Sequence, residues 1–292
     1  MNLFFDLFVG GISIGACYAL VALSMVIIYK TSEVPNFAQG EMAMISTFVA
    51  YTIMESYGAG FWVSAGLTLV FAFLLGVVLE LSFLRPADNP GILGSIVITL
   101  GAEMILYGLA GWKWGANQNP FPIPFSEYSG FTFGPIRITE VNLWTIVASL
   151  VIMLLLFAFF RYTKMGTAMK AVQQNAFAAK AMGIPTRRIL TLTWGLSSAT
   201  GAVAGMLIAP IATLDPNMML DPMLKGFAGA VLGGMTSLPG AALGAYMLGL
   251  IENYFGGYVS LEFKSVVAFA VIVVILCVRP SGLFVKHYEK KV

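Results

Sequence analysis

The residues best suited to chemistry in this sequence are carboxylates that interrupt apolar stretches: Glu41, Glu80 and Glu103. An ionisable side chain inside a membrane span is costly, and it usually faces a pathway or a partner. Glu80 lies within a turn or two of Arg85, which favours a local ion pair or snorkelling at the membrane interface. Glu103 lies in the middle of an apolar run, where it either lines a pathway or accepts an interhelical hydrogen bond.

The densest polar cluster beside any apolar run is the stretch VPNFAQGEM, which holds Asn36, Gln39 and Glu41. These side chains offer hydrogen bonds but no nucleophile with a neighbouring base. The sequence contains no Gly-x-x-x-x-Gly-Lys-Ser/Thr loop, no Gly-x-Ser-x-Gly elbow and no His-Glu-x-x-His motif. These absences argue against an enzyme, and against an ATPase of the P-loop kind in particular.

The remaining candidate ligands have simpler explanations. Cys17 and Cys277 both fall inside apolar runs, where a cysteine is a small buried hydrophobe, and their spacing predicts neither a disulfide framework nor a zinc site. His287 is the single histidine, and we expect it on the solvated surface of a polar tail. The sequence therefore predicts no metal and no cofactor.

The composition places the chain in a membrane, because 59% of its residues are hydrophobic and only 10% are charged. Soluble domains average about 25% charged residues. A span needs roughly 20 apolar residues, so 292 residues suffice for about eight or nine spans. We expect one all-α, polytopic membrane domain over 1–292. Its basic residues gather at span ends and in one loop, which is not the pattern of a nucleic-acid surface.

The apolar runs give the positions of the spans. The first, 4–29, has no basic region before it and is expected to be retained instead of cleaved. Pairs of glycines four residues apart predict close helix contacts at Gly11 and Gly15, and at Gly201 and Gly205. The segment 113–141 is the longest polar connection. The other predicted spans are a second one ending at Met54, then 61–84, 91–112, 142–160, 189–213, 240–256 and 263–279.

The segment 226–236 is apolar but too short to cross a membrane by itself, and it is interrupted at residues 236–239. A broken helix is tolerated at membrane depth only where it is buried in protein or lines a cavity. The Gly-rich break could line a pathway, or it could serve helix packing alone.

The segment 164–188 is unlike any other part of the chain, because it is basic and lies between two long apolar runs. Good helix formers predict one helix as far as Gly183, a C-terminal stop, with Pro185 just beyond. Its apolar face is rich in methionine and its other face carries bases and amides. Such a helix either lies on anionic lipid or docks on a soluble partner in the cytosol and transmits force to the membrane bundle.

The distribution of bases predicts the orientation of the chain. Lys30, Arg85, the 161–188 loop and the C-terminal tail together hold 12 of the 16 Lys and Arg residues. The positive-inside rule puts these segments and the C-terminus in the cytoplasm, and the N-terminus outside. This topology requires 226–236 to count as a short crossing.

Four blocks of the sequence resemble, in type and order, the permease subunits of branched-chain amino-acid ABC importers. The chain length suits the shorter, LivH-type permease of such systems. The blocks are VPNFAQGEM after the first span, GTAMKAVQQNAFAAKAMGIPTRRILTLTWGLSSATGAVAG, GGMTSLPGAALGA and RPSGLF.

The resemblance implies a multi-pass permease of a bacterial-type inner membrane, in contact with lipid and without an ATPase site of its own. Its implied partners are a second related permease, two cytosolic ATPases and an extracytoplasmic solute-binding protein. In the family, a loop with an Ala-Ala-x-x-x-Gly core docks on the ATPase. Here Gln174, Asn175 and Phe177 stand where an acidic residue might be expected. We therefore expect docking through Met169, Val172, Ala178, Ala179, Met182 and Gly183.

An aliphatic amino acid is a zwitterion with an apolar tail, so its path needs a few hydrogen-bonding groups among apolar walls. The predicted lining residues are Asn36, Gln39, Glu41, Thr99, Glu103, Gly233, Gly234, Thr236 and Ser237. Permeases for urea or short-chain amides share the same blocks. An ion-coupled secondary transporter or channel is an alternative of a different class, and it would transport solute without an ATPase.

Overall fold

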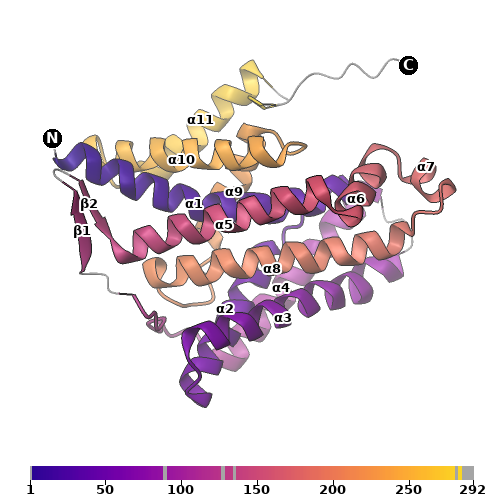
Figure 1. Ribbon diagram of the computed structural model, residues 1–292, viewed down its shortest axis with the longest axis horizontal. Helices are drawn as coiled ribbons and strands as arrows, with labels where there is room; N and C mark the ends of the chain where they lie inside the picture. Colours follow the sequence, from indigo (N-terminus) through magenta and orange to yellow (C-terminus); the bar gives the residue numbers. More distant parts are fainter. Residues whose placement is uncertain (1, 88–90, 126–128, 134–135, 280–281, 285–292) are drawn as a thin grey trace.

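The computed structural model describes residues 2–87, 91–125, 129–133, 136–279 and 282–284. Long helices lie side by side in this part of the chain, with a short β-hairpin at one end (Figure 1). Five of the described helices are long and apolar enough to cross a membrane. This confirms the predicted all-α membrane bundle. These helices are α1 (Asn2–Ser32), α3 (Phe61–Leu79), α4 (Gly91–Trp114), α5 (Glu140–Tyr162) and α8 (Thr186–Ala212).

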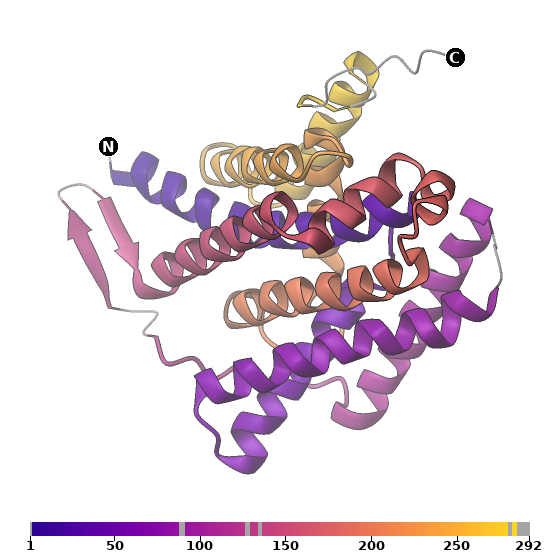
Figure 2. The ribbon, with the colours of Figure 1, turned by 45° about the vertical axis from the view of Figure 1, so that its right-hand side comes forward.

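Helix α1 runs through the middle of the bundle. In its most apolar stretch 89% of the residues are buried, against 17% in α4. Its partners include α10 (Leu238–Tyr258), α8 and α5, which surround it in Figure 2. The predicted glycine face of α1 packs against α10, where a Cβ added to Gly15 would lie 3.0 Å from Cα of Tyr246. Helices α3, α4 and α5 instead expose many large apolar side chains, as lipid-facing helices do.

Helix α8 is also largely buried in the bundle, and it packs against α3, α1 and α2 (Gln39–Tyr57). Its predicted glycine face lies against α2. A Cβ added to Gly205 would lie 2.9 Å from the Ala43 carbonyl oxygen, and one added to Gly201 would collide with the Gln39 side chain. The small residues thus bring two backbones close together, as the sequence predicts.

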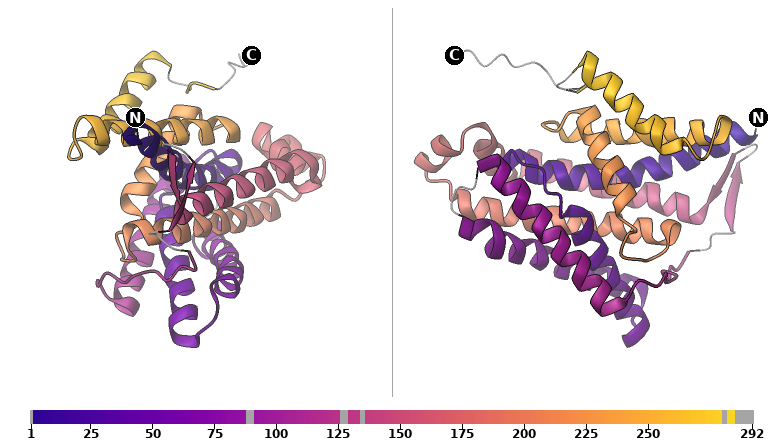
Figure 3. Two further views of the ribbon diagram at one scale, coloured as in Figure 1. Left: turned by 60° about the vertical axis from the view of Figure 1, so that its left-hand side comes forward. Right: turned by 180° about the vertical axis from the view of Figure 1, so that it is seen from behind.

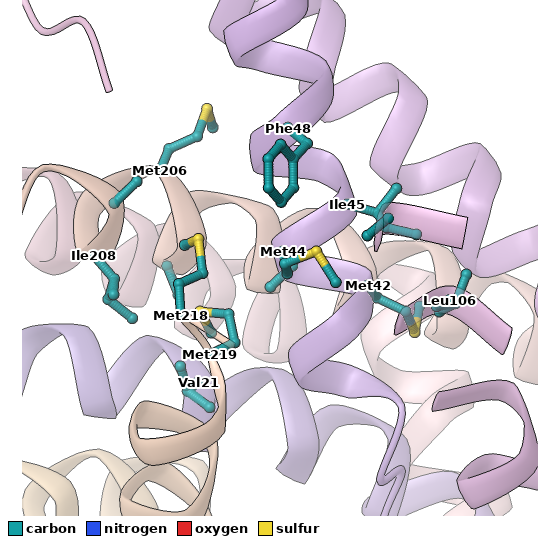
Figure 4. Close-up of a cluster of buried hydrophobic side chains, with 14 of the residues drawn as sticks. Val21, Met42, Met44, Ile45, Phe48, Leu106, Met206, Ile208, Met218 and Met219 are labelled. Atoms are coloured by element: carbon teal, nitrogen blue, oxygen red, sulfur yellow. The ribbon is translucent and has the colours of Figure 1, made fainter. Parts of the chain in front are cut away.

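Methionines fill much of the core between α2, α8 and the 213–219 segment. Met44, Met206, Met218 and Met219 are buried and belong to one cluster with Phe48 (Figure 4). Methionine is unbranched and polarizable, so it fills irregular gaps and tolerates rearrangement. This packing accommodates small shifts between α2 and α8 more readily than branched side chains would.

The connection between α4 and α5 contains a hairpin that the sequence analysis did not predict. Strands β1 (Gly130–Phe133) and β2 (Ile136–Thr139) pair antiparallel, with Phe131 opposite Ile138. Asn119 and Leu214 exchange two backbone hydrogen bonds of 3.0 Å, which tie this connection to the segment after α8. The hairpin lies beside the N-terminus (Figure 1).

Helix α9 (Leu220–Gly233) is steeply inclined to α1 and α8 (Figure 3). It begins earlier than the predicted 226, and its 14 residues span about 21 Å at about 1.5 Å each. The break after α9 lies at the end of the bundle that carries α6 (Lys164–Gln174), because Thr236 and Ser237 line a cavity there with Lys30, Arg161 and Lys170. The short crossing that the predicted topology requires stays a prediction.

After α10, helix α11 (Lys264–Val278) returns the chain toward the break. The Leu283 N–H donates to the Leu232 carbonyl at 2.9 Å, which satisfies one of the free carbonyls at the end of α9. Residues 280–281 and 285–292 lie outside the described residues, and with them His287, the tail lysines and part of the RPSGLF block.

Candidate functional site

A buried cluster of hydrogen-bonded side chains, the polar knot, joins α1, α2 and α8 where the chain turns back into the bundle. It consists of Asn36, Gln39 and Ser197. Asn36 closes the turn, since its Oδ1 accepts from the Ala38 N–H at 3.1 Å and its Nδ2 donates to Gln39 Oε1 at 3.3 Å. Gln39 Nε2 donates to the Ser197 carbonyl at 3.2 Å. The Ser197 hydroxyl lies 2.9 Å from Gln39 Oε1 and 2.6 Å from the Ser24 carbonyl.

The knot fixes the depth at which α2 begins. Asn36 and Gln39 are 0% and 1% exposed, so solvent does not reach them in this conformation. Gln39 bonds Ser197 in the middle of α8, and Ser197 in turn donates to the Ser24 carbonyl of α1, so α2 starts inside the bundle instead of at its end. Both residues bind helices together here, and their role in lining a path stays a prediction.

The predicted carboxylates Glu41 and Glu103 lie on α2 and α4, two helices that pack against each other. Glu41 lies in the first turn of α2 and is buried, while Glu103 on α4 is half-buried. The two carboxylates are within electrostatic range of each other. Thr99 is also buried on α4, but its hydroxyl donates to the Ile96 carbonyl of its own helix at 2.9 Å. Thr99 therefore has less to offer a solute than the two carboxylates have.

Asn36→Ala should destabilise the protein, because it leaves the buried Ala38 N–H without its acceptor and removes one hydrogen bond from the Gln39 amide. We expect a loss of about 1–3 kcal/mol in the free energy of unfolding, measured as a lower melting temperature in detergent. Asn117→Ala, at an exposed position of the α4–α5 connection, is the matched control and should leave the melting temperature unchanged.

Uptake measured with Asn36→Ala and Glu41→Gln tests whether these two residues line the solute path. Unchanged transport in both variants would remove them from it.

The Gly-rich break divides into two parts with different surroundings. Gly233 packs against the Gly240 backbone, and a Cβ added to Gly244 would lie 2.5 Å from the Gly233 nitrogen. The glycines of the break thus hold α9 and α10 together. Thr236 and Ser237 instead line a cavity of about 430 Å³ with Lys30, Arg161 and Lys170. Of the two interpretations left open, packing accounts for Gly233, and Gly234 has the positive φ of 104° that glycine adopts without strain.

The basic segment forms two short helices where the sequence predicted one. Helix α6 (Lys164–Gln174) ends at Asn175, and α7 (Ala176–Ala181) begins there. Asn175 is extended, with φ −162°, and its Oδ1 accepts from the Ala178 N–H at 2.9 Å. An asparagine that caps a new helix competes with continuation of the old one, and helix propensity alone does not reveal this. Gly183 ends the segment with φ 83°, as predicted.

The two faces of this segment differ from the predicted docking face. Met169, Val172 and Ala179 are buried inside the chain, in a cluster that includes Phe160 and Ile189. In this conformation these three residues of the predicted docking set face the bundle and not the surface, and their role in docking stays a prediction. The exposed residues lie on and just after α7: Phe177 at 84%, Met182 at 83%, Ala178 and Gly183. The buried face anchors the segment, and its tip projects at the end of the bundle opposite the hairpin (Figure 1).

A polar link connects the start of α8 to the end of α3. Helix α3 continues as a π-helical turn, Glu80–Leu84, in which Glu80 is 2% exposed. The Thr191 hydroxyl donates to Glu80 Oε2 at 2.8 Å, and Arg85 lies 3.3 Å from the same oxygen. The predicted Glu80–Arg85 pair is confirmed, and Thr191 ties it to the helix that follows α7.

Glu80→Gln should weaken this link, since it removes the charge that Arg85 and Thr191 share. We expect a loss of about 1–3 kcal/mol in the free energy of unfolding, because a partner of a charged group is lost at a buried position. Thermal unfolding in detergent measures it, with the exposed Glu55→Gln as a matched control. An equal melting temperature for the two variants would mean that the link does not hold α3 to α8.

A cluster of charged residues that the sequence analysis did not single out lies toward the end of the bundle that carries the N-terminus. Lys225 on α9 is 4% exposed and forms ion pairs with Asp221, at 2.6 Å, and with the fully buried Glu252 of α10. Lys264 lies 3.7 Å from the same Glu252 oxygen. The sequence held the signal, because Glu252 lies in an apolar run and Asp221 precedes Lys225 by one helical turn.

Comparison with known proteins decides the family. Residues 7–276 match the family described as the branched-chain amino acid transport system / permease component. The chain belongs to this permease family. It is 30% identical to the high-affinity branched-chain amino acid transport system permease protein LivH of Escherichia coli, over 97% of this chain and 96% of LivH. It is 26% identical to BraD of Pseudomonas aeruginosa, a permease protein of the same description, with the same coverage.

Relatives described as carrying other solutes also match. The xylose/arabinose import permease protein XylH of Sulfolobus acidocaldarius is 28% identical over 73% of this chain and 59% of XylH. The resemblance inferred from the four sequence blocks is thereby confirmed, and the chain is a multi-pass permease subunit of an ABC importer of the branched-chain amino acid type.

In this permease the predicted site residues fall into separate places. Asn36 and Gln39 are hydrogen-bonded in the knot, Glu41 and Glu103 lie on the neighbouring helices α2 and α4, and Thr236 and Ser237 lie at the basic end. The exposed residues of the predicted docking set lie apart from all of these, beyond α6.

Proposed function

We propose that this permease carries branched-chain amino acids as the membrane subunit of an ATP-driven importer, and that separate ATPases dock on the 164–188 segment. The description of the family and those of LivH and BraD support this solute class. The exposed tip of the 164–188 segment is the observation that carries the coupling proposal.

The contacts of the 164–188 segment would let a docked partner move the helices of the bundle. Its tip exposes Phe177 and Met182, two large apolar side chains that water disfavours and a docking cleft would cover. Helix α6 rests on α1 and α5, and α7 leads within a few residues into α8. A partner that pulls on α7 therefore acts directly on α8 and, through Met169 and Val172, on α1 and α5.

The position of the bases supports the proposed orientation. Lys30, Arg161 and Lys170 surround one cavity at the end of the bundle that carries α6 and α7. Arg85 and Arg187 line another cavity, of about 470 Å³, at the ends of α3 and α8. The positive-inside rule makes this end cytoplasmic, puts the N-terminus and the β-hairpin outside, and places the permease in a bacterial-type inner membrane.

The proposed partners follow from what this chain lacks. It contains no P-loop motif, so two cytosolic ATPases supply the energy. A second related permease completes the pore, an extracytoplasmic binding protein delivers the solute, and lipid covers the exposed apolar faces of α3 and α4. The 1–292 chain acts as one permease domain whose 164–188 segment is its cytoplasmic coupling region.

Reconstitution in liposomes tests the proposal. Leucine uptake is expected only when ATP, the ATPases, the second permease and the binding protein are all present, with the partners taken from neighbouring genes. Uptake by this chain alone, driven by an ion gradient, would make it a secondary transporter. Uptake of urea, a short-chain amide or a sugar in place of leucine would keep the ATP-driven mechanism and reassign the solute.

A further inference from the structure

A charged cavity opens among α1, α8, α9, α10 and α11, at the end of the bundle that carries the N-terminus. Its volume of about 440 Å³ lies in the range of small-ligand sites. Ile14 of α1 and Ile208 of α8 contribute apolar wall, and Lys225, Glu252 and Lys264 contribute charge. The cavity thus combines one apolar wall with charges of both signs.

Glu252 is the residue whose surroundings require an explanation. It is fully buried, and its Oε1 already accepts from Lys225 and lies near Lys264. Its Oε2 is buried as well and has no donor at full hydrogen-bonding geometry among the described residues, although the Tyr18 hydroxyl on the cavity wall is close enough to interact with the Glu252 carboxylate. A buried carboxylate oxygen without a donor is costly, and most of all within a membrane protein. A ligand with N–H donors would satisfy it.

Lys264 supplies the opposite charge. Its Nζ lies 3.7 Å from Glu252 Oε1, well beyond the roughly 2.7–2.9 Å of a charge-assisted hydrogen bond. The side chain is 25% exposed, so its ammonium group can still bind a carboxylate. Lys225 is different, because Asp221 and Glu252 already hold it on two sides.

We propose that this cavity binds the zwitterionic head of an aliphatic amino acid on its way into the permease. The ammonium group donates to Glu252 Oε2, the carboxylate pairs with Lys264, and the side chain lies between Ile14 and Ile208. Lys225 positions Glu252 and contributes no direct contact. This inference rests on the proposed solute class, and it adds a site that the predicted lining residues do not include.

A labelling experiment on the assembled importer tests the site without measuring transport. Ser265 also lines the cavity, and Ser265→Cys, with Cys17 and Cys277 changed to Ala, gives one reporter thiol for a membrane-impermeant maleimide. Leucine should slow its labelling at concentrations about tenfold lower than leucinamide, which lacks the carboxylate, or 4-methylpentanoate, which lacks the ammonium group. This factor corresponds to the loss of one charge-assisted contact.

Charge-removing variants separate binding from structure. Glu252→Gln should raise the leucine concentration needed for protection about tenfold, and Glu55→Gln, at an exposed carboxylate on α2, should leave that concentration unchanged. If Glu252→Gln alters the labelling rate without ligand, Lys264→Gln replaces it as the deciding variant, because the looser contact of Lys264 matters less to the fold. An unchanged leucine concentration for protection in the deciding variant, or equal protection by all three compounds, overturns the site.

The outcomes also distinguish this inference from the proposed function. An importer that takes up leucine while leucine gives no protection would disprove the site and leave the function standing. A complete importer that takes up no leucine would disprove the proposed solute, whatever the labelling shows.

Discussion

Replacing Phe177 and Met182 with aspartate is expected to abolish ATP-driven uptake while the permease still folds. The two side chains are 84% and 83% exposed, so their loss costs the isolated chain little. Buried in an ATPase cleft, a large apolar anchor is worth about 2 kcal/mol or more at an interface. Two aspartates would also bring charge into that contact. Co-purification of the ATPases and ATP-dependent leucine uptake measure the effect.

Phe131→Asp is the matched control for this prediction. Phe131 is 55% exposed on β1, in the hairpin at the opposite end of the bundle. The same substitution there should leave ATPase binding unchanged. Normal ATPase assembly and full uptake in the Phe177→Asp/Met182→Asp variant would remove the docking assignment. Loss of assembly in both variants would point to a general folding defect instead.

Gly249→Leu is expected to be strongly destabilising. A Cβ added to Gly249 would lie 2.5 Å from Cα of Gly15, so α1 and α10 would have to separate. The atoms nearest to this Cβ belong to the backbone of Gly15 and Gly11, which cannot rotate away as a flexible side chain can. Overpacking of this kind costs about 3 kcal/mol, at the upper end of its usual range, and it acts on the most extensive helix contact in the molecule.

Gly108→Leu separates this steric effect from the general effect of leucine in a helix. No atom lies within 4 Å of a Cβ added to Gly108 on α4, apart from its own helix neighbourhood. We expect a change within about 0.5 kcal/mol there. Tryptophan fluorescence during thermal unfolding in detergent compares the two variants. Equal melting temperatures would mean that the α1–α10 contact is not rigid.

The spans could be predicted from the sequence because hydrophobic run length is a local property. The predicted 61–84 and 142–160 correspond to Phe61–Leu79 with its π-helical turn and to Glu140–Tyr162. The glycine pairs on α1 and α8 were also predictable, since small residues four apart mark one face of a helix. The β-hairpin was missed because four-residue strands carry too little periodic signal in a long polar connection.

The candidate sites were less predictable, because they depend on which residues meet. Composition and apolar run length by themselves predicted a polytopic helical membrane protein with a basic segment between two spans and no P-loop, and the resemblance of four sequence blocks pointed to the permease family. The tertiary structure alone decided that Met169 and Val172 face inward while Phe177 and Met182 face outward, since burial depends on the packing of α6 against α1 and α5. Only the tertiary structure shows that Lys225 pairs with Glu252, because this contact depends on how the inclined helix α9 packs against α10.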